Sequence, residues 1–342
     1  MSEVRFSRVA IESVAHVLPD ERVRTSSLEE QLAPLYRDIG LKPGLVESLT
    51  GVAERRLWPR EVSPSDAATL AAQEALNRAG VPQDRIGAVV FTGVSKDVLE
   101  PSMASLVHGA LGLHPGALNF DVGNACLGFL TGLSTVGSMI ELGQIDAGLV
   151  VAGESSRPVT EATLARLSAP GADFQALREE MASLTLGSGA AAMVLARTDL
   201  ASHPERRLLG GAATAATAHA GLCRGTMTRM RTDATKLLSE GVAVATETWR
   251  KTQRTFSLAA SEIAAFCLHQ VGKANHDAVL RALGLPAERS PRLYPDLGNM
   301  GAASVPVALS QAVSSGLMRS GERGVLMGIG SGLNSWMMVV DW

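Results

Sequence analysis

The two halves of the sequence repeat one order of elements, and this repeat limits the possible folds more than any other feature. In the first half, a helical pattern at 65–79, N-capped at Ser65, precedes an apolar strand pattern at 86–91. The second half repeats the pair, with a helix at 239–252 and a strand at 263–268. Helices that alternate with short buried strands in two similar halves predict a duplicated α/β fold with mostly parallel strands.

The repeat divides the chain into an N-terminal half, residues 1–197, and a C-terminal half, residues 198–342. Residues 1–60 carry mixed helix and strand signals, so we expect them at the periphery of the fold. Residues 155–185 are polar, contain prolines and a glutamate-rich helical stretch, and interrupt the order of strands. We interpret them as a cap inserted into the first half.

Composition narrows the class of protein. With 46% hydrophobic residues and 34 glycines among 342 residues, the chain can bury a large aliphatic core. Its formal net charge of -3 argues against nucleic acid or an anionic membrane as a partner. The three cysteines show no short metal-ligand spacing, which indicates reduced thiols, no metal site and a cytoplasmic protein. We expect neither a signal peptide nor a transmembrane helix.

One cysteine lies at a junction that suits a nucleophile. Cys126 falls between a strand pattern at 117–122 and a helical pattern that carries leucine, valine and isoleucine at three- and four-residue spacing up to Ile140. At the first turn of a helix, unpaired backbone N–H groups and the helix dipole favour thiolate over thiol. We therefore predict that Cys126 is a catalytic nucleophile on a buried helix. The alternative is a small core side chain, as most buried free cysteines are.

Two more polar residues stand where an apolar strand pattern stops. His269 follows the strand at 263–268, and Asn299 lies between glycine and methionine further on. Functional sites of such sheets lie at the strand ends, so a duplicated fold brings Cys126 and His269 face to face. Alone, such a histidine is more often an ordinary loop residue, and such an asparagine is more often a turn residue. Their occurrence together with Cys126 favours a catalytic role for His269 and Asn299.

These residues sit in recognisable motifs, and the sequence resembles the thiolase superfamily over nearly its whole length. Within it, the sequence is most similar to ketoacyl synthase III and to the OleA-type condensing enzymes of olefin biosynthesis. The resemblance is weakest at 1–60 and 155–185, and it implies a layered αβαβα thiolase fold. It rests on four motifs in order: Asn124-Ala-Cys-Leu-Gly128, Leu268-His-Gln-Val271, Gly298-Asn-Met-Gly-Ala-Ala-Ser304 and Gly328-Ile-Gly-Ser-Gly-Leu-Asn334.

The resemblance also implies a chemistry. Cys126 takes an acyl group from an acyl-CoA as a thioester, and a second acyl thioester then attacks it as an α-carbanion. His269 and Asn299 donate hydrogen bonds to the enolate oxygen of that second substrate. The backbone N–H groups of Cys126 and Ser331 bind the tetrahedral oxyanion. The substrates are coenzyme A thioesters, and no other cofactor is implied.

Departures from the ketoacyl synthase pattern point to the OleA branch. The sequence reads His269-Gln-Val-Gly-Lys273 where carrier-protein synthases have His-Gln-Ala-Asn, and the terminal glycine loop carries Ser331 where degradative thiolases have a second cysteine. OleA-type proteins place a glutamate from the partner subunit at the position of Glu100. The resemblance thus implies a homodimer in which Glu100 removes an α-proton in trans. Such a base needs an apolar channel that raises its pKa; an exposed loop carboxylate is the alternative.

Three arginines, Arg224, Arg229 and Arg231, suit the phosphates of coenzyme A, although a solvated surface explains them equally well. The predicted reaction is head-to-head, non-decarboxylative condensation of two long-chain acyl-CoA molecules. It gives a 2-alkyl-3-ketoalkanoic acid for downstream enzymes of olefin and hydrocarbon biosynthesis. The alternatives are a synthase that decarboxylates a malonyl thioester, a hydroxymethylglutaryl-CoA synthase and a non-catalytic partner subunit.

Overall fold

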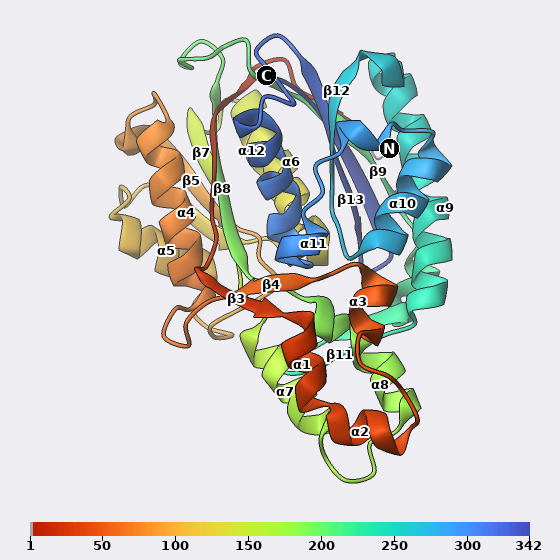
Figure 1. Ribbon diagram of the computed structural model, residues 1–342. Coiled ribbons are helices and arrows are strands. Elements are labelled where there is room, and N and C mark those ends of the chain that lie inside the picture. The colour runs from red at the N-terminus through yellow and green to blue at the C-terminus, as the bar shows by residue number, and fades with distance from the viewer. Residues whose placement is uncertain (1–2) are drawn as a thin grey trace.

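The computed structural model describes residues 3–342, which fold into five stacked layers in the order α, β, α, β, α (Figure 1). Helices α4 (Pro64–Arg78) and α5 (Met103–Leu111) cover one outer face. Helices α9 (Ala234–Phe256) and α10 (Lys273–Leu283) cover the opposite outer face. The layered arrangement implied by the resemblance is confirmed.

The strands form one large mixed sheet in the order β12-β13-β14-β9-β2-β8-β7-β5-β6, with β1 paired to β9. Only β12–β13, β5–β6 and β5–β7 are parallel pairs, so the prediction of mostly parallel strands is wrong. The reason is that β14 returns from β13 through a tight turn, and β8 returns antiparallel to β7 after the cap. The strands are β1 (Glu3–Arg5), β2 (Val9–Val17), β5 (Ile86–Phe91), β6 (Leu118–Asp121), β7 (Ala147–Glu154), β8 (Gly189–Arg197), β9 (Arg207–Ala215), β12 (Ile263–Leu268), β13 (Arg323–Gly330) and β14 (Asn334–Asp341).

The internal repeat is visible in the pairing of the strands. In the first half, β8 pairs antiparallel with both β2 and β7, and β7 pairs in parallel with β5. In the second half, β14 pairs antiparallel with both β9 and β13, and β13 pairs in parallel with β12. The two halves meet where β2 touches β9, and the predicted boundary between residues 197 and 198 falls between β8 and β9.

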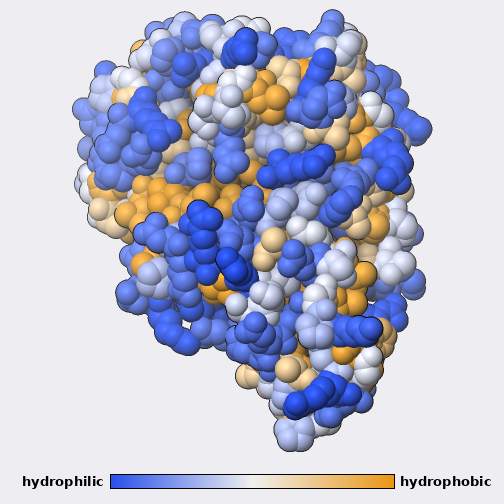
Figure 2. All heavy atoms as spheres, in the orientation of Figure 1, coloured by the Kyte–Doolittle hydropathy of each residue, from blue (hydrophilic) through white to orange (hydrophobic). Residues whose placement is uncertain are grey.

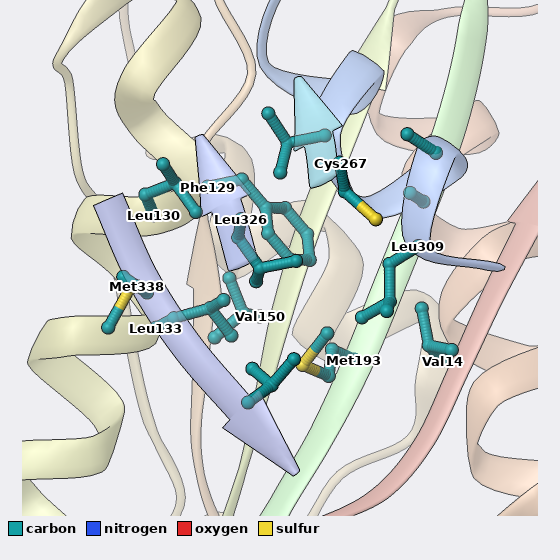
Figure 3. Close-up of a cluster of buried hydrophobic side chains, with 14 of the residues drawn as sticks. Val14, Phe129, Leu130, Leu133, Val150, Met193, Cys267, Leu309, Leu326 and Met338 are labelled. Carbon is teal, nitrogen blue, oxygen red and sulfur yellow. The ribbon is translucent and has the colours of Figure 1, made fainter. Parts of the chain in front are cut away.

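The middle layer holds α6 (Gly128–Glu141) and α12 (Ser304–Ser314), which lie between the two halves of the sheet (Figure 1). Phe129, Leu130 and Leu133 of α6 are buried in one cluster with side chains from both halves (Figure 3). Burying a side chain of this size contributes about 1.5–3 kcal/mol. The prediction that the helix after Cys126 is buried is confirmed, and this burial fixes the helix on which the cysteine loop stands.

Local signals explain the ends of α4. Its N-cap is Ser63, two residues before the predicted Ser65, and the Ser63 side chain accepts from the Asp66 backbone N–H. Asp66 in turn accepts from the Ser63 N–H, so the two residues form a capping box. A proline at 64 suits the first helical position because its missing N–H has no helical partner.

Residues 3–60 are not peripheral throughout, which corrects that prediction. Strand β2 lies in the middle of the sheet and is buried along most of its length, because its apolar residues pair on both edges. The following helices join the predicted cap to form a separate lobe at the narrow end of the molecule (Figure 1). The lobe contains α1 (Thr25–Gln31), α2 (Ala33–Asp38), α3 (Leu45–Thr50), α7 (Arg157–Leu167) and α8 (Phe174–Glu180).

Short elements connect these layers. No helix among residues 3–342 combines the length and apolar character needed to cross a membrane. On the face seen in Figure 2, apolar atoms gather near the lower ends of α4 and α5.

The remaining elements are short. They are β3 (Glu21–Arg24), β4 (Glu54–Leu57), β10 (Cys223–Gly225), β11 (Met230–Thr232), α11 (Tyr294–Leu297) and short 3-10 turns that include η2 (Ala125–Leu127), η3 (Met181–Thr185) and η7 (Gly301–Ala303).

Candidate active site

Cys126 stands in a tight turn between β6 and α6. The turn η2 begins at Ala125, whose φ of 47° is a left-handed conformation that costs a residue with a side chain about 1–3 kcal/mol. Gly330 allows the turn to approach β13, since a Cβ there would lie 3.0 Å from Leu127 Cγ and 3.4 Å from its backbone N. The surrounding structure therefore holds Cys126 in a strained turn, as suits a nucleophile.

The thiol of Cys126 is not activated as the sequence suggested. Burial and, to a smaller extent, the charges of Glu154 and Cys223 together raise its pKa to about 12, while a backbone N–H acts in the opposite direction. The expectation of a resting thiolate at a helix start is therefore wrong. Cys126 lies in a 3-10 turn before α6 begins at Gly128, so the end of that helix does less for the thiolate than the surrounding protein does against it.

His269 and Asn299 meet directly. His269 follows β12, and its backbone N–H donates to Met327 O of β13 at 2.8 Å. Its ring Nε2 lies 3.1 Å from Asn299 Oδ1, which also accepts from the Gly301 N–H at 3.0 Å. That backbone donor fixes the amide, so Oδ1 faces His269 and Gly301 while Nδ2 points elsewhere. The histidine then carries its ring proton on Nε2.

Burial lowers the pKa of His269 to about 4, against the hydrogen bond to Asn299, which raises it. The ring is therefore neutral at ordinary pH and has a proton to donate from Nε2. A neutral N–H donor stabilises the negative charge that develops on an enolate oxygen by a hydrogen bond and keeps its own proton. This pair has the chemistry expected of an oxyanion site, and the structure brings it together from two distant segments.

Three backbone contacts hold the loop that carries Asn299. Its N–H donates to Thr185 O at 2.9 Å, and its carbonyl accepts from the Gly187 N–H at 2.9 Å. The chain at Gly187 passes so close that an added Cβ would lie 1.8 Å from Leu297 O. Asn299 is 8% exposed. The end of the cap segment thus clamps the Asn299 loop in one position.

The Cys126 turn contacts both the turn η7 after Asn299 and the end of β13. Ser331 begins the tight turn between β13 and β14, next to Gly330. Asn334 Nδ2, at the other side of this turn, donates to Asn124 Oδ1 at 3.2 Å. The structure therefore brings the Ser331 turn against the Cys126 turn, as binding of one oxyanion by both backbones requires.

Glu100 lies apart from these residues within one chain. It sits on an exposed loop after β5, beside Leu99, which is 96% exposed. The apolar channel expected around Glu100 is not formed by its own subunit. Several contacts hold the base of the loop; among them, Asp97 accepts from the Ser65 N–H at 3.1 Å, and Lys96 pairs with Asp121. The loop is fixed at its base and presents its apolar tip outward.

Comparison with known protein sequences shows which family this chain belongs to. The profile described as 3-Oxoacyl-[acyl-carrier-protein (ACP)] synthase III matches residues 120–212, and the profile of its C-terminal part matches residues 254–342. The acyl-CoA:acyl-CoA alkyltransferase of Xanthomonas campestris pv. campestris is 40% identical over 337 residues, 98% of this chain and 99% of the relative. The chain belongs to the acyl-CoA:acyl-CoA alkyltransferase family.

Other members of the alkyltransferase family agree in sequence and in structure. The Shewanella oneidensis alkyltransferase is 38% identical over 352 residues, covering 99% of this chain and 100% of the relative. A crystal structure of Xanthomonas campestris OleA, a cysteine-to-serine variant with bound lauric acid and lauroyl-CoA, superimposes with a TM-score of 0.96 at 39% identity. The match covers 98% of this chain and 100% of that chain, so the thiolase fold is confirmed.

The arginines predicted to bind coenzyme A in this alkyltransferase-family chain are only partly free. Arg229 Nε lies 3.0 Å from Glu180, which also pairs with Arg166, and Arg231 pairs with Glu179, so both arginines already contact carboxylates of the cap. Arg224 lies exposed on β10, and residues 3–342 offer it no ion pair. Of the three, Arg224 is the one without a carboxylate partner among residues 3–342.

Reasoning from the sequence did not single out Glu154, the last residue of β7. It is 4% exposed and accepts hydrogen bonds from backbone groups on both sides of the candidate site. A glutamate that ends the apolar run 148–152 looks like an ordinary surface residue. One signal was available: the chain before the cap reads Gly153-Glu154-Ser155, a short polar stretch directly after a buried strand.

Proposed function

We propose that this protein joins two long-chain acyl-CoA molecules head to head by a non-decarboxylative Claisen condensation. In the first step, the Cys126 sulfur attacks the thioester carbonyl of one acyl-CoA. The thiol proton leaves, coenzyme A departs, and the acyl group stays on the sulfur. The backbone N–H groups of Cys126 and Ser331 bind the oxyanion that forms on the way. Burial and the charge of Glu154 raise the pKa of the resting thiol, so the sulfur gives up its proton in the course of the attack.

In the second step, another acyl-CoA loses an α-proton to Glu100, and its enolate carbon attacks the acyl group on Cys126. The Cys126 sulfur leaves, which gives a 2-alkyl-3-ketoacyl-CoA. Water then hydrolyses that thioester and releases the 2-alkyl-3-ketoalkanoic acid. Two molecules of coenzyme A leave for each product, and the chemistry needs no bound cofactor.

The observation that carries this proposal is the His269–Asn299 pair. The Gly301 N–H holds Asn299 Oδ1, and burial keeps His269 neutral with its Nε2 proton directed to the same oxygen. A neutral imidazole N–H beside a side-chain amide suits the oxygen of an enolate, which can take the place of Oδ1 as the acceptor. A non-catalytic subunit has no need of such a pair beside a strained cysteine turn.

We further propose that the active protein is a homodimer in which Glu100 acts on the partner's site. Strand β6 ends the sheet, and its Leu118 is 52% exposed. The neighbouring loop adds Val94, Val98 and Leu99 as exposed apolar side chains. An uncovered apolar edge strand invites pairing with another chain. A second copy on this edge would cover it and carry Glu100 toward another subunit's Cys126.

The proposal extends to the surroundings of the reaction. Coenzyme A would place a phosphate near Arg224, which has the free charge. All three cysteines are free thiols, as suits a cytoplasmic enzyme. The β-keto acid would pass to downstream enzymes of hydrocarbon biosynthesis that act on its ketone and carboxylate.

Incubation with a single saturated long-chain acyl-CoA tests the reaction. The expected result is free coenzyme A and β-keto acid in a ratio of two to one, without any malonyl thioester and without carbon dioxide from condensation. A protein that condenses only after addition of malonyl-CoA, with release of carbon dioxide, would be a decarboxylating synthase instead.

Glu100→Gln tests the base and its origin. The variant keeps the side-chain shape, so the acyl-enzyme should form normally and condensation should fall by about 100- to 10,000-fold. Mixing it with Cys126→Ala should restore part of the activity, because one site of the mixed dimer then has both intact residues. Full activity of Glu100→Gln alone contradicts the assignment, and failure of the mixture to recover contradicts the action in trans.

A further inference from the structure

Glu154 is a buried carboxylate with a full set of donors. One oxygen, Oε1, accepts from the Val94 N–H at 2.9 Å and from the Ala302 N–H at 2.9 Å. The other, Oε2, accepts from the Ser95 N–H at 3.0 Å and the Ser95 hydroxyl at 2.9 Å. No arginine or lysine pairs with it among residues 3–342. Only an acceptor on both oxygens satisfies all four donors.

These donors come from the two segments that carry the second step of the reaction. Val94 and Ser95 begin the loop that leads to Glu100, five residues further on. Ala302 follows the loop of Asn299, and between them Gly301 has a φ of 51° and leaves no room for a Cβ, which would lie 2.7 Å from Glu154 Oε1. The Gly301 N–H in turn fixes the Asn299 amide.

We propose that Glu154 is a positioning residue for condensation, because its single carboxylate fixes the loop that bears Glu100 and the loop that bears Asn299 relative to each other. The inference rests on the proposed function. Since Glu100 serves the partner's Cys126 while Asn299 serves its own, Glu154 joins the two active sites of a dimer. Each carboxylate aligns the amide donor of one site and the base of the other.

The carboxylate also acts on the nucleophile. Its charge is the largest influence after burial that raises the pKa of the Cys126 thiol, with Cys223 contributing in the same direction. Burial raises the pKa of Glu154 itself, while its backbone and hydroxyl donors lower it. Removal of the charge must therefore change the titration of Cys126, an effect that loss of packing alone does not predict.

Glu154→Gln is the test, because glutamine keeps the shape, removes the charge and turns an NH2 group toward backbone N–H donors. A displacement on the order of 1 Å in either loop costs roughly 100-fold in rate. We expect condensation of a saturated acyl-CoA to fall by that amount, while the acyl-enzyme, followed by intact-protein mass spectrometry, forms at least as fast as in wild type. Alkylation of Cys126 by iodoacetamide, measured on its peptide, should move to lower pH.

Glu12→Gln is the matched control. Glu12 on β2 is 1% exposed and accepts from the backbone N–H groups of Gly80 and Ser202, but it lies toward the other end of the sheet. The substitution imposes the same burial of an amide against backbone donors. We expect it to leave both the condensation rate and the pH profile of Cys126 alkylation as in wild type.

Mixed dimers, purified through two affinity tags, separate the two loops. A dimer of Glu154→Gln with Cys126→Ala has one working cysteine, whose own Asn299 loop is altered. A dimer of wild type with the double variant Glu154→Gln/Cys126→Ala has one working cysteine, whose Glu100 comes from an altered loop. We expect both to condense more slowly than the dimer of wild type with Cys126→Ala.

The outcomes are distinct. Suppose that wild type condenses acyl-CoA. If Glu154→Gln then condenses at the wild-type rate, or shows an unshifted profile of Cys126 alkylation, the positioning role is overturned and the proposed function stays intact. A mixed dimer that matches its reference overturns the link between the two loops. A wild type that makes acyl-enzyme but no β-keto acid refutes the proposed function itself, whatever the variant does.

Discussion

Gly187→Ala perturbs the candidate site without touching a reacting group. Gly187 lies at the end of the cap segment, and its N–H donates to the carbonyl of Asn299. A Cβ built at this position would lie 1.8 Å from Leu297 O and 3.0 Å from the carbonyl carbon of the same residue. Both contacts are with backbone, so no side-chain rotation relieves them.

The size of the effect follows from this geometry. Real Cβ atoms essentially never approach closer than 3.0 Å, so the two backbone segments must separate by about 1.2 Å. A misplacement on the order of 1 Å at a catalytic group costs roughly 100-fold in rate, which corresponds to about 2.7 kcal/mol of activation free energy. Overpacking should also lower the free energy of unfolding by about 1–3 kcal/mol.

The assay compares two steps in one variant. Acyl-enzyme formation on Cys126, followed by intact-protein mass spectrometry, should stay within about threefold of wild type, while β-keto acid production falls about 100-fold. Gly109→Ala is the control, since nothing lies within 4 Å of its Cβ position. Loss of acyl-enzyme formation together with β-keto acid production would mean general damage to the fold. Condensation within twofold of wild type would show that the Asn299 loop is not held as tightly as the contact with Leu297 requires.

Further predictions concern the reacting residues. Cys126→Ala should gain no acyl mass from acyl-CoA; an acyl mass at the wild-type rate would mean another nucleophile. His269→Ala should slow condensation by about 100- to 1,000-fold and acylation much less, as rapid-quench measurements can resolve. Because the folded pKa of His269 is about 4 and its ordinary value 6.5, the unfolded chain binds this proton first as pH falls. The stability that neutral His269 contributes is therefore full above pH 6.5 and lost toward pH 4. Urea unfolding should show a steeper loss over this window in wild type than in His269→Ala; equal slopes would contradict the depressed pKa.

Much of the secondary structure was readable from the sequence. The strands 86–91 and 263–268 have the bounds that their apolar runs predicted, because a short run buried on both faces carries its own signal. The buried helix after Cys126 follows from its spacing of apolar residues. The duplication of the two halves was visible for the same reason, since repeated patterns need no knowledge of contacts.

Strand direction was not readable. The apolar pattern of β14 is the same whether it runs with β13 or against it, and only the tight turn at 331–333 makes it antiparallel. The position of β2 in the centre of the sheet depends likewise on partners more than a hundred residues away. Local signals therefore assigned residues 1–60 to the periphery, although tertiary pairing places their main strand in the core.

At the site, motifs in the sequence determined which residue types are present, and the fold decided their states. Cys126, His269 and Asn299 stood out by motif, but a titration state depends on lost water and on charges that arrive from other segments. Glu154 shows the limit most clearly. Its neighbours in sequence are ordinary, and its role arises because four donors from residues 94–95 and 302 converge on it. Backbone groups look identical in every sequence, so only their arrangement in three dimensions turns one glutamate into the link between two loops.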